Sequence, residues 1–301
     1  MTTDERDTVA WRIFLAEATA RLRDAGVGSA EVDARRIVEQ ASGYEGAELF
    51  LGLDEPATHR GVVQFDRMLA RRVAGEPLQY VLGAWGFRTL DLFVDRRVLI
   101  PRPETESVVE RALGELDRLR AGSASSARPF TVVDLGTGSG AIALSIAAER
   151  PGIDVWATDV SPDALAVARS NLAGLGRAGA RVRLSEGSWL DALPDELRGS
   201  IDLIVTNPPY VATDDDLPSE VQDWEPTQAL IAGPTGREAI EQILTRAPGW
   251  LATRGALVVE LAPGQAAFVA AFARDVGFDE TEVAPDLTGR DRMVIARRGG
   301  G

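Results

Sequence analysis

Residues 131–150, TVVDLGTGSGAIALSIAAER, join two apolar stretches of different character through a glycine-rich turn. TVVDL is rich in β-branched residues and indicates a buried strand, whereas the apolar stretch after residue 140 has the length of a helix. The glycines between them allow a ligand to approach the main chain closely, and the N-terminus of the helix offers it free N–H groups. The segment therefore predicts a strand–turn–helix unit with a binding loop at the carboxyl end of the strand.

The same alternation of short apolar runs and helical stretches continues to the end of the chain. Further strands are expected at 154–159, 181–187, 201–207, 255–261 and 292–297, with helices at 161–176, 236–247 and 264–277. Strands that alternate with helices form a mostly parallel sheet covered on both faces. We therefore expect an α/β fold whose ligand lies at the carboxyl edge of an open sheet.

The expected strand in residues 131–135 and the next one, in residues 154–159, each bring an acid to that edge. Asp159 ends the second strand, where a carboxylate can accept both hydroxyls of a ribose, so the ligand is expected to contain a nucleoside. The spacing Gly136-x-Gly138-x-x-Ala141, with Asp159 downstream, fits NAD. Asp134 favours S-adenosylmethionine instead, because an acid there can meet the amino group of a methionine moiety. The loop alone leaves both cofactors open, beside the simpler reading of a tight turn without a ligand.

The fourth expected strand, in residues 201–210, ends with the tetrapeptide NPPY. Asn207 should emerge at the carboxyl edge of the sheet, beside the glycine loop. Pro208 and Pro209 stiffen the segment because they fix φ and lack N–H groups. Asn207 Oδ1 and the Pro208 carbonyl can accept hydrogen bonds from a planar amine or amide, with Tyr210 as a wall. A proline turn that only ends the strand would leave Asn207 and Tyr210 unexplained.

The composition of the 301-residue chain narrows the chemistry. It has no cysteine and one histidine, His59, which we expect on the surface, so thiolate chemistry and metal sites built from Cys or several His are excluded. The net charge of −14 disfavours a long phosphate backbone as partner, because affinity for nucleic acid comes largely from basic side chains. The polar start and the shortness of the apolar stretches indicate a cytoplasmic chain without a membrane span.

The N-terminal part of the chain has a different pattern. Residues 8–82 carry apolar positions at helical spacing, Ile13, Leu22 and Val32 among them, and predict a small bundle of short helices. Residues 83–100 are richer in aromatic and β-branched residues and predict a β-hairpin. The expected boundaries are a helical domain at 1–82, a hairpin linker at 83–103 and the α/β domain at 104–301, with a flexible loop, AGSASSARP, at 121–129.

Five further segments, in order beside NPPY, carry a resemblance to a known family. They are GEPLQYVLGAWGF at 75–87, LIPRPETE at 99–106, EPTQAL at 225–230, VVELAPGQ at 258–265 and GRDRMVIA at 289–296. DLGTGSG with NPPY resembles S-adenosylmethionine-dependent methyltransferases that modify planar nitrogens. The five segments are similar to the peptide chain release factor N5-glutamine methyltransferases over nearly the whole chain. This resemblance implies a Rossmann-like methyltransferase fold with a mostly parallel seven-stranded sheet and a small N-terminal helical domain that contacts the release factor.

The resemblance also implies an activity and a set of residues. The activity is methyl transfer from S-adenosylmethionine to the side-chain amide nitrogen (N5) of the glutamine in the Gly-Gly-Gln (GGQ) motif of class I peptide chain release factors. S-adenosylhomocysteine is the expected product, without a metal, without direct contact to nucleic acid or membrane, and in a monomer. The expected catalytic residues are Asn207, Pro208 and Tyr210, and Pro209 joins them in binding the substrate. The expected cofactor residues are Asp134, Gly136, Thr137, Gly138, Ser139, Gly140, Asp159 (ribose), Trp189 (near the adenine) and Asn207.

Two other functions stay open on the sequence. A DNA or RNA amino-group methyltransferase of the N6-adenine type uses a similar tetrapeptide. It needs a basic groove and a base-flipping pocket, which the acidic charge disfavours. A binding module that keeps the fold without catalysis is the second alternative, but it would have no reason to retain both the cofactor loop and NPPY.

Overall fold

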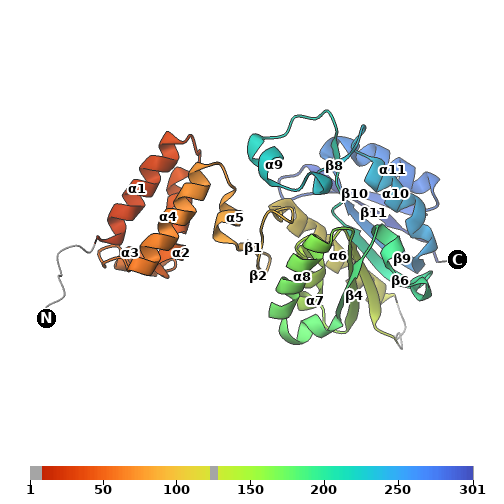
Figure 1. The fold of residues 1–301 in the computed structure, drawn as a ribbon. Helices are drawn as coiled ribbons and strands as arrows, with labels where there is room; N and C mark the ends of the chain where they lie inside the picture. The colour runs from red at the N-terminus through yellow and green to blue at the C-terminus, as the bar shows by residue number, and fades with distance from the viewer. Residues whose placement is uncertain (1–8, 123–127, 301) are drawn as a thin grey trace. The chain divides into compact units, whose positions relative to one another are not determined.

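The computed structural model describes residues 9–122 and 128–300 of the chain. The chain divides into two compact units, Met1–Gly83 and Ala84–Gly301, which are described separately (Figure 1). Most of the loop expected at 121–129 lies outside the described residues.

The first unit is helical. Its helices are α1 (Trp11–Asp24), α2 (Ala30–Ser42), α3 (Ala47–Gly52), α4 (His59–Val73) and α5 (Leu78–Leu82). Leu22, Ile37 and Phe65 are fully buried among them, which confirms the small helical domain expected from the apolar spacing. Ile13 and Val32 are exposed, so the apolar spacing overstates the width of the buried faces.

Polar contacts tie α4 to its neighbours where the motif GEPLQY begins. Arg72 donates to Asp33 of α2 over 2.7 Å and to the carbonyl of Glu76 over 3.0 Å. Arg71 donates to both carboxylate oxygens of Glu76, over 2.7 and 2.6 Å, and to the carbonyl of Tyr80 over 2.8 Å. Arg72 and Asp33 are both buried, so the loss of either partner would leave an unpaired charge inside the unit. This motif therefore contributes to the stability of the helical unit.

The second unit begins with a β-hairpin in which β1 (Trp85–Phe87) pairs antiparallel with β2 (Leu90–Leu92). Arg88 turns the chain between them with φ of 51°. Its guanidinium donates to both carboxylate oxygens of Glu149, over 2.6 and 2.7 Å, and its N–H donates to Glu106 over 3.0 Å. These contacts fasten the hairpin to the α/β part of the unit.

A seven-stranded sheet forms the centre of the second unit. Its strands are β3 (Phe130–Leu135), β4 (Ile153–Asp159), β5 (Val182–Glu186), β6 (Ile201–Thr206), β9 (Leu251–Glu260), β10 (Glu280–Pro285) and β11 (Asp291–Arg297). They lie in the order β10-β11-β9-β6-β3-β4-β5. All neighbours are parallel except at β11, which is antiparallel to β9 and β10. The mostly parallel seven-stranded α/β sheet is confirmed.

The apolar pattern does not predict the edge strand β10. Its sequence ETEVAP mixes acids and a proline with few apolar residues, and it pairs with β11 alone. An edge strand tolerates charges and proline because one row of its backbone groups needs no partner strand. The pattern also omits β7 (Val211–Ala212), β8 (Ile231–Gly233) and α9 (Ser219–Trp224), which follow the NPPY segment.

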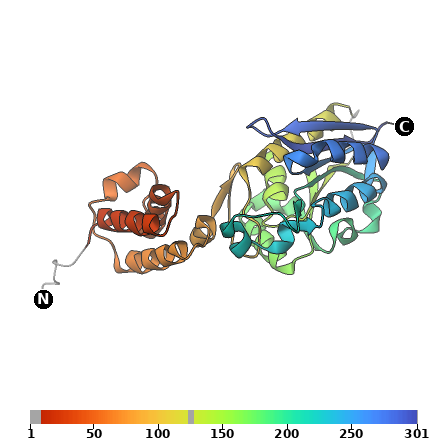
Figure 2. The same cartoon turned by 90° about the horizontal axis from the view of Figure 1, so that it is seen from above.

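Helices cover both faces of the sheet (Figure 1, Figure 2). They are α6 (Pro103–Ala121), α7 (Ala141–Glu149) and α8 (Pro162–Gly174) on one face, and α10 (Glu238–Arg246) and α11 (Ala266–Asp275) on the other. Val133 and Leu135 of β3 belong to the core beneath α10 and α11. Side chains alternate along a strand, so Asp134 between them faces α7.

The order of the strands reverses between β3 and β6. The chain proceeds from β3 to β4 and β5 on one side, and from β6 to β9 on the other. In an open parallel sheet such a point leaves a crevice at the carboxyl ends of the two strands. The glycine loop follows β3 and NPPY follows β6, so the fold brings the two motifs together.

Candidate active site

The loop after β3 takes a conformation that its glycines require. Gly136, Gly138 and Gly140 have φ of 72°, 56° and 87°, values that residues with a Cβ rarely adopt. The Gly136 N–H donates to the carbonyl of Thr158 over 2.9 Å, which fixes the loop against β4. A Cβ at Gly136 would lie 3.1 Å from the ring of Trp189. The loop therefore presents bare backbone beside an aromatic side chain.

Asp159, the last residue of β4, is held by two backbone N–H groups. Its Oδ2 accepts from Gly138 and its Oδ1 from Ser161, each over 2.9 Å. Burial raises the pKa of this carboxyl above its ordinary value, and the two N–H groups oppose that shift. A carboxylate oxygen can accept more than one hydrogen bond, so both oxygens keep capacity for a ligand hydroxyl.

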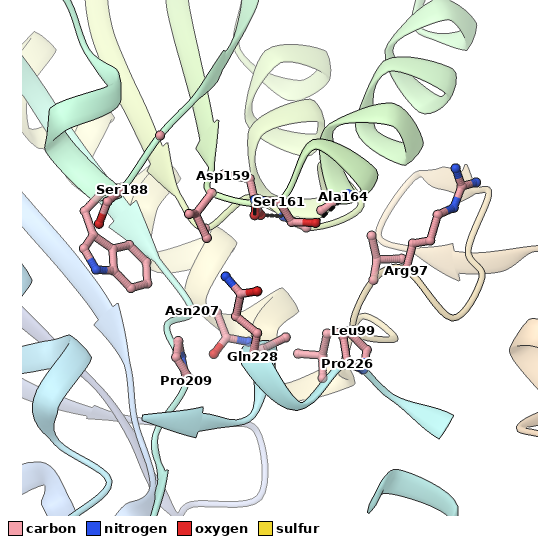
Figure 3. Close-up of a pocket in the computed structure, with 17 residues that line it drawn as sticks. Arg97, Leu99, Asp159, Ser161, Ala164, Ser188, Asn207, Pro209, Pro226 and Gln228 are labelled. Atoms are coloured by element: carbon pink, nitrogen blue, oxygen red, sulfur yellow. Dashed lines mark hydrogen bonds between the residues drawn. The ribbon is translucent and has the colours of Figure 1, made fainter. Parts of the chain in front are cut away.

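A cavity of about 340 Å³ opens at the switch point, a size typical of small-molecule sites (Figure 3). Figure 3 shows Asp159 and Ser161 on one side of it, with Asn207, Pro209 and Gln228 opposite. The expected cofactor residues that line this cavity are Gly136, Gly138, Asp159, Trp189 and Asn207. The expected residues that are buried and do not belong to its described lining are Asp134, Thr137, Ser139 and Gly140.

The side chain of Asp134 is buried at the N-terminus of α7. Its Oδ2 accepts from the Thr137 hydroxyl over 2.6 Å and from the Ala143 N–H over 3.1 Å, in the first turn of α7. Burial raises the pKa of this carboxyl to about 7. The other oxygen, Oδ1, is buried and has no hydrogen-bond partner among the described residues. The expected contact of Asp134 with the amino group of a methionine moiety stays a prediction.

A second cavity, of about 190 Å³, adjoins the first. Pro208 and Tyr210 line it, and Arg102 contributes to the same wall. Asn207 lines both cavities, as do Leu99 and Ala229, which lie between them. The four NPPY residues thus stand at the junction of a larger and a smaller space, with Asn207 common to both.

Behind Asn207 lies a buried polar network that the sequence motifs contain but do not explain. The Asn207 Nδ2 donates to the Thr105 hydroxyl over 3.2 Å, and that hydroxyl donates to Glu260 Oε2 over 2.7 Å. The Tyr210 hydroxyl lies 3.4 Å from Glu260 Oε1. Burial raises the pKa of Glu260 to about 7, and burial likewise raises that of Tyr210 to about 12. Glu260 ends β9, the strand next to β6. Its position at the end of a strand could have indicated from the sequence that it lies at the site.

Two other motif residues hold the walls of the cavities. Glu225 is buried and accepts from the Ile100 N–H over 3.1 Å and from the Arg102 guanidinium over 2.5 Å. The Gln265 Nε2 donates to the Tyr210 carbonyl over 3.1 Å. Segments 99–106, 225–230 and 258–265 therefore converge on NPPY, although they are far apart in the sequence.

The raised pKa of Glu260 makes stability depend on pH. Between its unfolded pKa, about 4.5, and its folded pKa, about 7, the folded chain holds a proton that the unfolded chain has lost. The free energy of unfolding should therefore fall as pH rises through this window. A Glu260→Gln variant lacks that slope, while the buried Asp134 contributes equally to both proteins.

Thermal unfolding of both proteins at about pH 5 and about pH 8 measures this effect. The quantity to compare is the unfolding midpoint of Glu260→Gln minus that of the unsubstituted chain. This difference should rise by on the order of 5 °C from about pH 5 to about pH 8. A difference between the proteins that does not change with pH would mean that Glu260 titrates in its ordinary range.

Within residues 9–122 and 128–300, no three side chains of His, Asp or Glu are grouped so that they could hold a metal ion. No described helix is long and apolar enough to cross a membrane.

Family models match both units of the chain. The model described as "PrmC N-terminal domain" matches residues 14–83, and the model described as "Methyltransferase small domain" matches residues 123–223. Among solved structures, the hMettl16 catalytic domain in complex with MAT2A 3′UTR hairpin 6 has a TM-score of 0.52 at 16% identity, over 80% of this chain and 82% of that chain. At this identity the likeness shows the fold alone.

Curated relatives match over nearly their full length, and each has the name release factor glutamine methyltransferase. The protein from Cereibacter sphaeroides is 41% identical over 94% of this chain and 96% of its own length. The proteins from Deinococcus radiodurans and Moorella thermoacetica are each 40% identical, over 96% and 95% of this chain and 99% and 98% of their own lengths.

The doubly wound sheet, the cavity at its switch point and the matched domain model define a methyltransferase. Within that class, the chain belongs to the release factor glutamine methyltransferase family. The resemblance drawn from the glycine loop, NPPY and the five further segments is confirmed.

Proposed function

We propose that the protein transfers a methyl group from S-adenosylmethionine to the side-chain amide nitrogen, N5, of the glutamine in the GGQ motif of class I peptide chain release factors. The observation that carries the proposal is the position of Asn207, which borders both cavities. A residue there can contact a methyl donor in one space and a planar amide in the other. The names of the relatives support glutamine of a release factor as that amide.

The larger cavity fits the cofactor. Its wall offers bare backbone at Gly136 and Gly138, an oriented carboxylate at Asp159 for the ribose, and the ring of Trp189 for the adenine. S-adenosylmethionine supplies, when bound, a methyl group activated by its positive sulfur. Asp134 and Thr137 support the loop from behind through their own hydrogen bond, and the Asp134 Oδ1, which has no partner among the described residues, would face the amino group of the methionine moiety.

The smaller cavity fits the glutamine side chain. Asn207 Oδ1 and the Pro208 carbonyl would each accept one N–H of the substrate amide, while Tyr210 and Pro209 limit its movement. An amide nitrogen is a poor nucleophile because its lone pair is delocalised into the carbonyl. Two acceptors in fixed positions favour electron density on nitrogen and stabilise the positive charge that arrives there, until a proton is lost. Holding the nitrogen in line with the methyl group contributes further, by up to about 7–11 kcal/mol in well-oriented systems.

The remaining parts of the proposal follow from that substrate. A protein substrate in translation implies a cytoplasmic enzyme that needs no direct contact with nucleic acid, and we propose that it acts as a monomer without a metal. The helical unit, residues 1–82, is proposed to contact the release factor outside the GGQ loop. Methylation of an amino group in DNA or RNA is the alternative, and the net charge of −14 opposes it.

Methyl transfer from labelled S-adenosylmethionine tests the substrate. We expect label in a purified class I release factor, at the GGQ glutamine by peptide mass spectrometry, and none in a release factor in which that glutamine is replaced by glutamate. Nucleic acid forms the third arm of the assay. Label in nucleic acid alone would overturn the proposal in favour of the alternative.

A further inference from the structure

The carboxamide of Asn207 has two possible orientations, which differ by exchange of Oδ1 and Nδ2. Only one of them turns Oδ1, an acceptor, toward the N–H groups of a bound amide. Two amides that face each other with N–H groups would repel, so the wrong orientation would abolish the clamp. The residues that hold the carboxamide in one orientation would therefore contribute to catalysis.

The protons of the buried network decide this orientation. Glu260, when ionised, has no proton to give and can only accept. The Thr105 hydroxyl has a single proton, and its 2.7 Å contact with Glu260 Oε2 uses it. Thr105 can then only accept from Asn207, so the atom that faces it over 3.2 Å is Nδ2. Oδ1 is left free for the cavity side.

Burial makes this assignment strong. Glu260 is 0% exposed and Thr105 is 4% exposed, so water cannot easily replace either hydrogen bond. With the carboxamide turned over, Oδ1 would face the lone pairs of the Thr105 oxygen, and a buried acceptor would lose its donor. Burial raises the pKa of Glu260 to about 7 and the Arg292 charge opposes that shift, so the proton count applies above about pH 7, where the carboxyl is ionised, and the measurements are made at about pH 8.

The fold explains why these three residues meet. Thr206 of β6 is in register with Val259 of β9, so the next residues of the two parallel strands, Asn207 and Glu260, leave the sheet side by side. Thr105 lies in the first turn of α6, which packs on the same two strands. The contact thus joins three segments that are far apart in the sequence.

We propose that Thr105 and Glu260 are positioning residues that fix the Asn207 carboxamide with Oδ1 toward the substrate amide. The catalytic meaning of this inference rests on the proposed function, whereas the orientation itself does not.

Asparagine labelling measures the orientation without any assay of activity. The chain has two asparagines, Asn171 and Asn207, so protein labelled with ¹⁵N-asparagine gives two side-chain NH₂ signals by NMR, and Asn207→Asp assigns them. In the unsubstituted chain the Asn207 signal should show one proton that exchanges slowly with solvent. Thr105→Val should abolish that protection. Asn171 is the internal control, because its Nδ2 donates to the carbonyls of Phe93 and Ser139 over 3.0 and 2.8 Å and does not contact Thr105.

Kinetics measure the consequence. Thr105→Val keeps the shape of the side chain and removes the hydroxyl, and should lower kcat at least about tenfold with unchanged affinity for S-adenosylmethionine. Thr105→Ser restores the hydroxyl and should restore kcat to within about threefold. Glu260→Gln should also lower kcat, because its amide can donate to Thr105 and so release the hydroxyl proton toward Asn207. Ser145→Ala is the control, since this buried hydroxyl of α7 has no partner among the described residues and lines neither cavity.

The outcomes separate the two proposals. Protection of the Asn207 signal that survives Thr105→Val overturns the positioning role, whatever the substrate. Equal kcat for Thr105→Val and the unsubstituted enzyme, measured on the release factor, does the same. Absence of methyl transfer to the release factor by the unsubstituted enzyme contradicts the proposed function and leaves the NMR result to decide the orientation.

Discussion

Replacement of Asn207 by alanine should lower turnover by about 10²-fold or more, while the protein still binds S-adenosylmethionine. The size of the effect is that of removing one preorganised contact from a site where charge develops in the transition state. Asn207 lines both cavities and its carboxamide donates to Thr105, so on the proposed function it would meet the substrate amide without reorganisation. Single-turnover rates with saturating release factor and cofactor measure the chemical step separately from binding.

The control for this substitution is Gln222→Ala, which removes an exposed carboxamide that lines neither cavity. It should leave the rate within about twofold of the unsubstituted enzyme. An Asn207→Ala enzyme that turns over normally with cofactor bound would show that the amide clamp is elsewhere. A simultaneous loss of cofactor affinity would place the main role of Asn207 in the larger cavity.

The sequence predicts the sheet well because the buried strands have simple patterns. β3, β4, β6 and β9 are apolar runs bounded by turns, and each is found within a few residues of its expected place. β10 is not predicted, since an edge strand has no need of an apolar run. The exposure of Ile13 and Val32 has a similar cause, because spacing indicates a helix but does not fix how wide a face its neighbours cover.

The position of a residue at the carboxyl end of a strand is the clearest sequence signal for this site. Gly136, Asp159 and Asn207 lie at such ends, and all three line the larger cavity. Asp134 lies one residue before the end of β3, and the Thr137 hydroxyl and Ala143 N–H hold its Oδ2 at the start of α7, so its contact with the cofactor stays a prediction. Thr105 and Glu260 were visible only as members of motifs, because their pairing depends on the register of β6 with β9 and on the packing of α6.

Replacement of Asp159 by alanine should weaken S-adenosylmethionine binding by about 10²-fold, with the fold intact. The carboxylate would lose hydrogen bonds to the ribose hydroxyls, and bonds to a charged group are worth about 1.5–3 kcal/mol. The Gly138 and Ser161 N–H groups would also lose their acceptor, which loosens the glycine loop. Stability should change little, because burial raises the pKa of Asp159 and removal of this desolvated charge offsets the lost backbone contacts. Isothermal calorimetry measures the affinity, and thermal unfolding measures the fold.

Asp163→Ala is the matched control for this prediction. Asp163 is an exposed acid in the first turn of α8, four residues further along the chain, and does not line the larger cavity. Its replacement should leave the affinity within about threefold, because an exposed charge at this distance is screened by solvent. If Asp159→Ala bound the cofactor as tightly as Asp163→Ala does, the ribose would have to be held by another group. A loss of affinity confined to Asp159→Ala, with both variants folded, would assign the ribose to this carboxylate and the larger cavity to the cofactor.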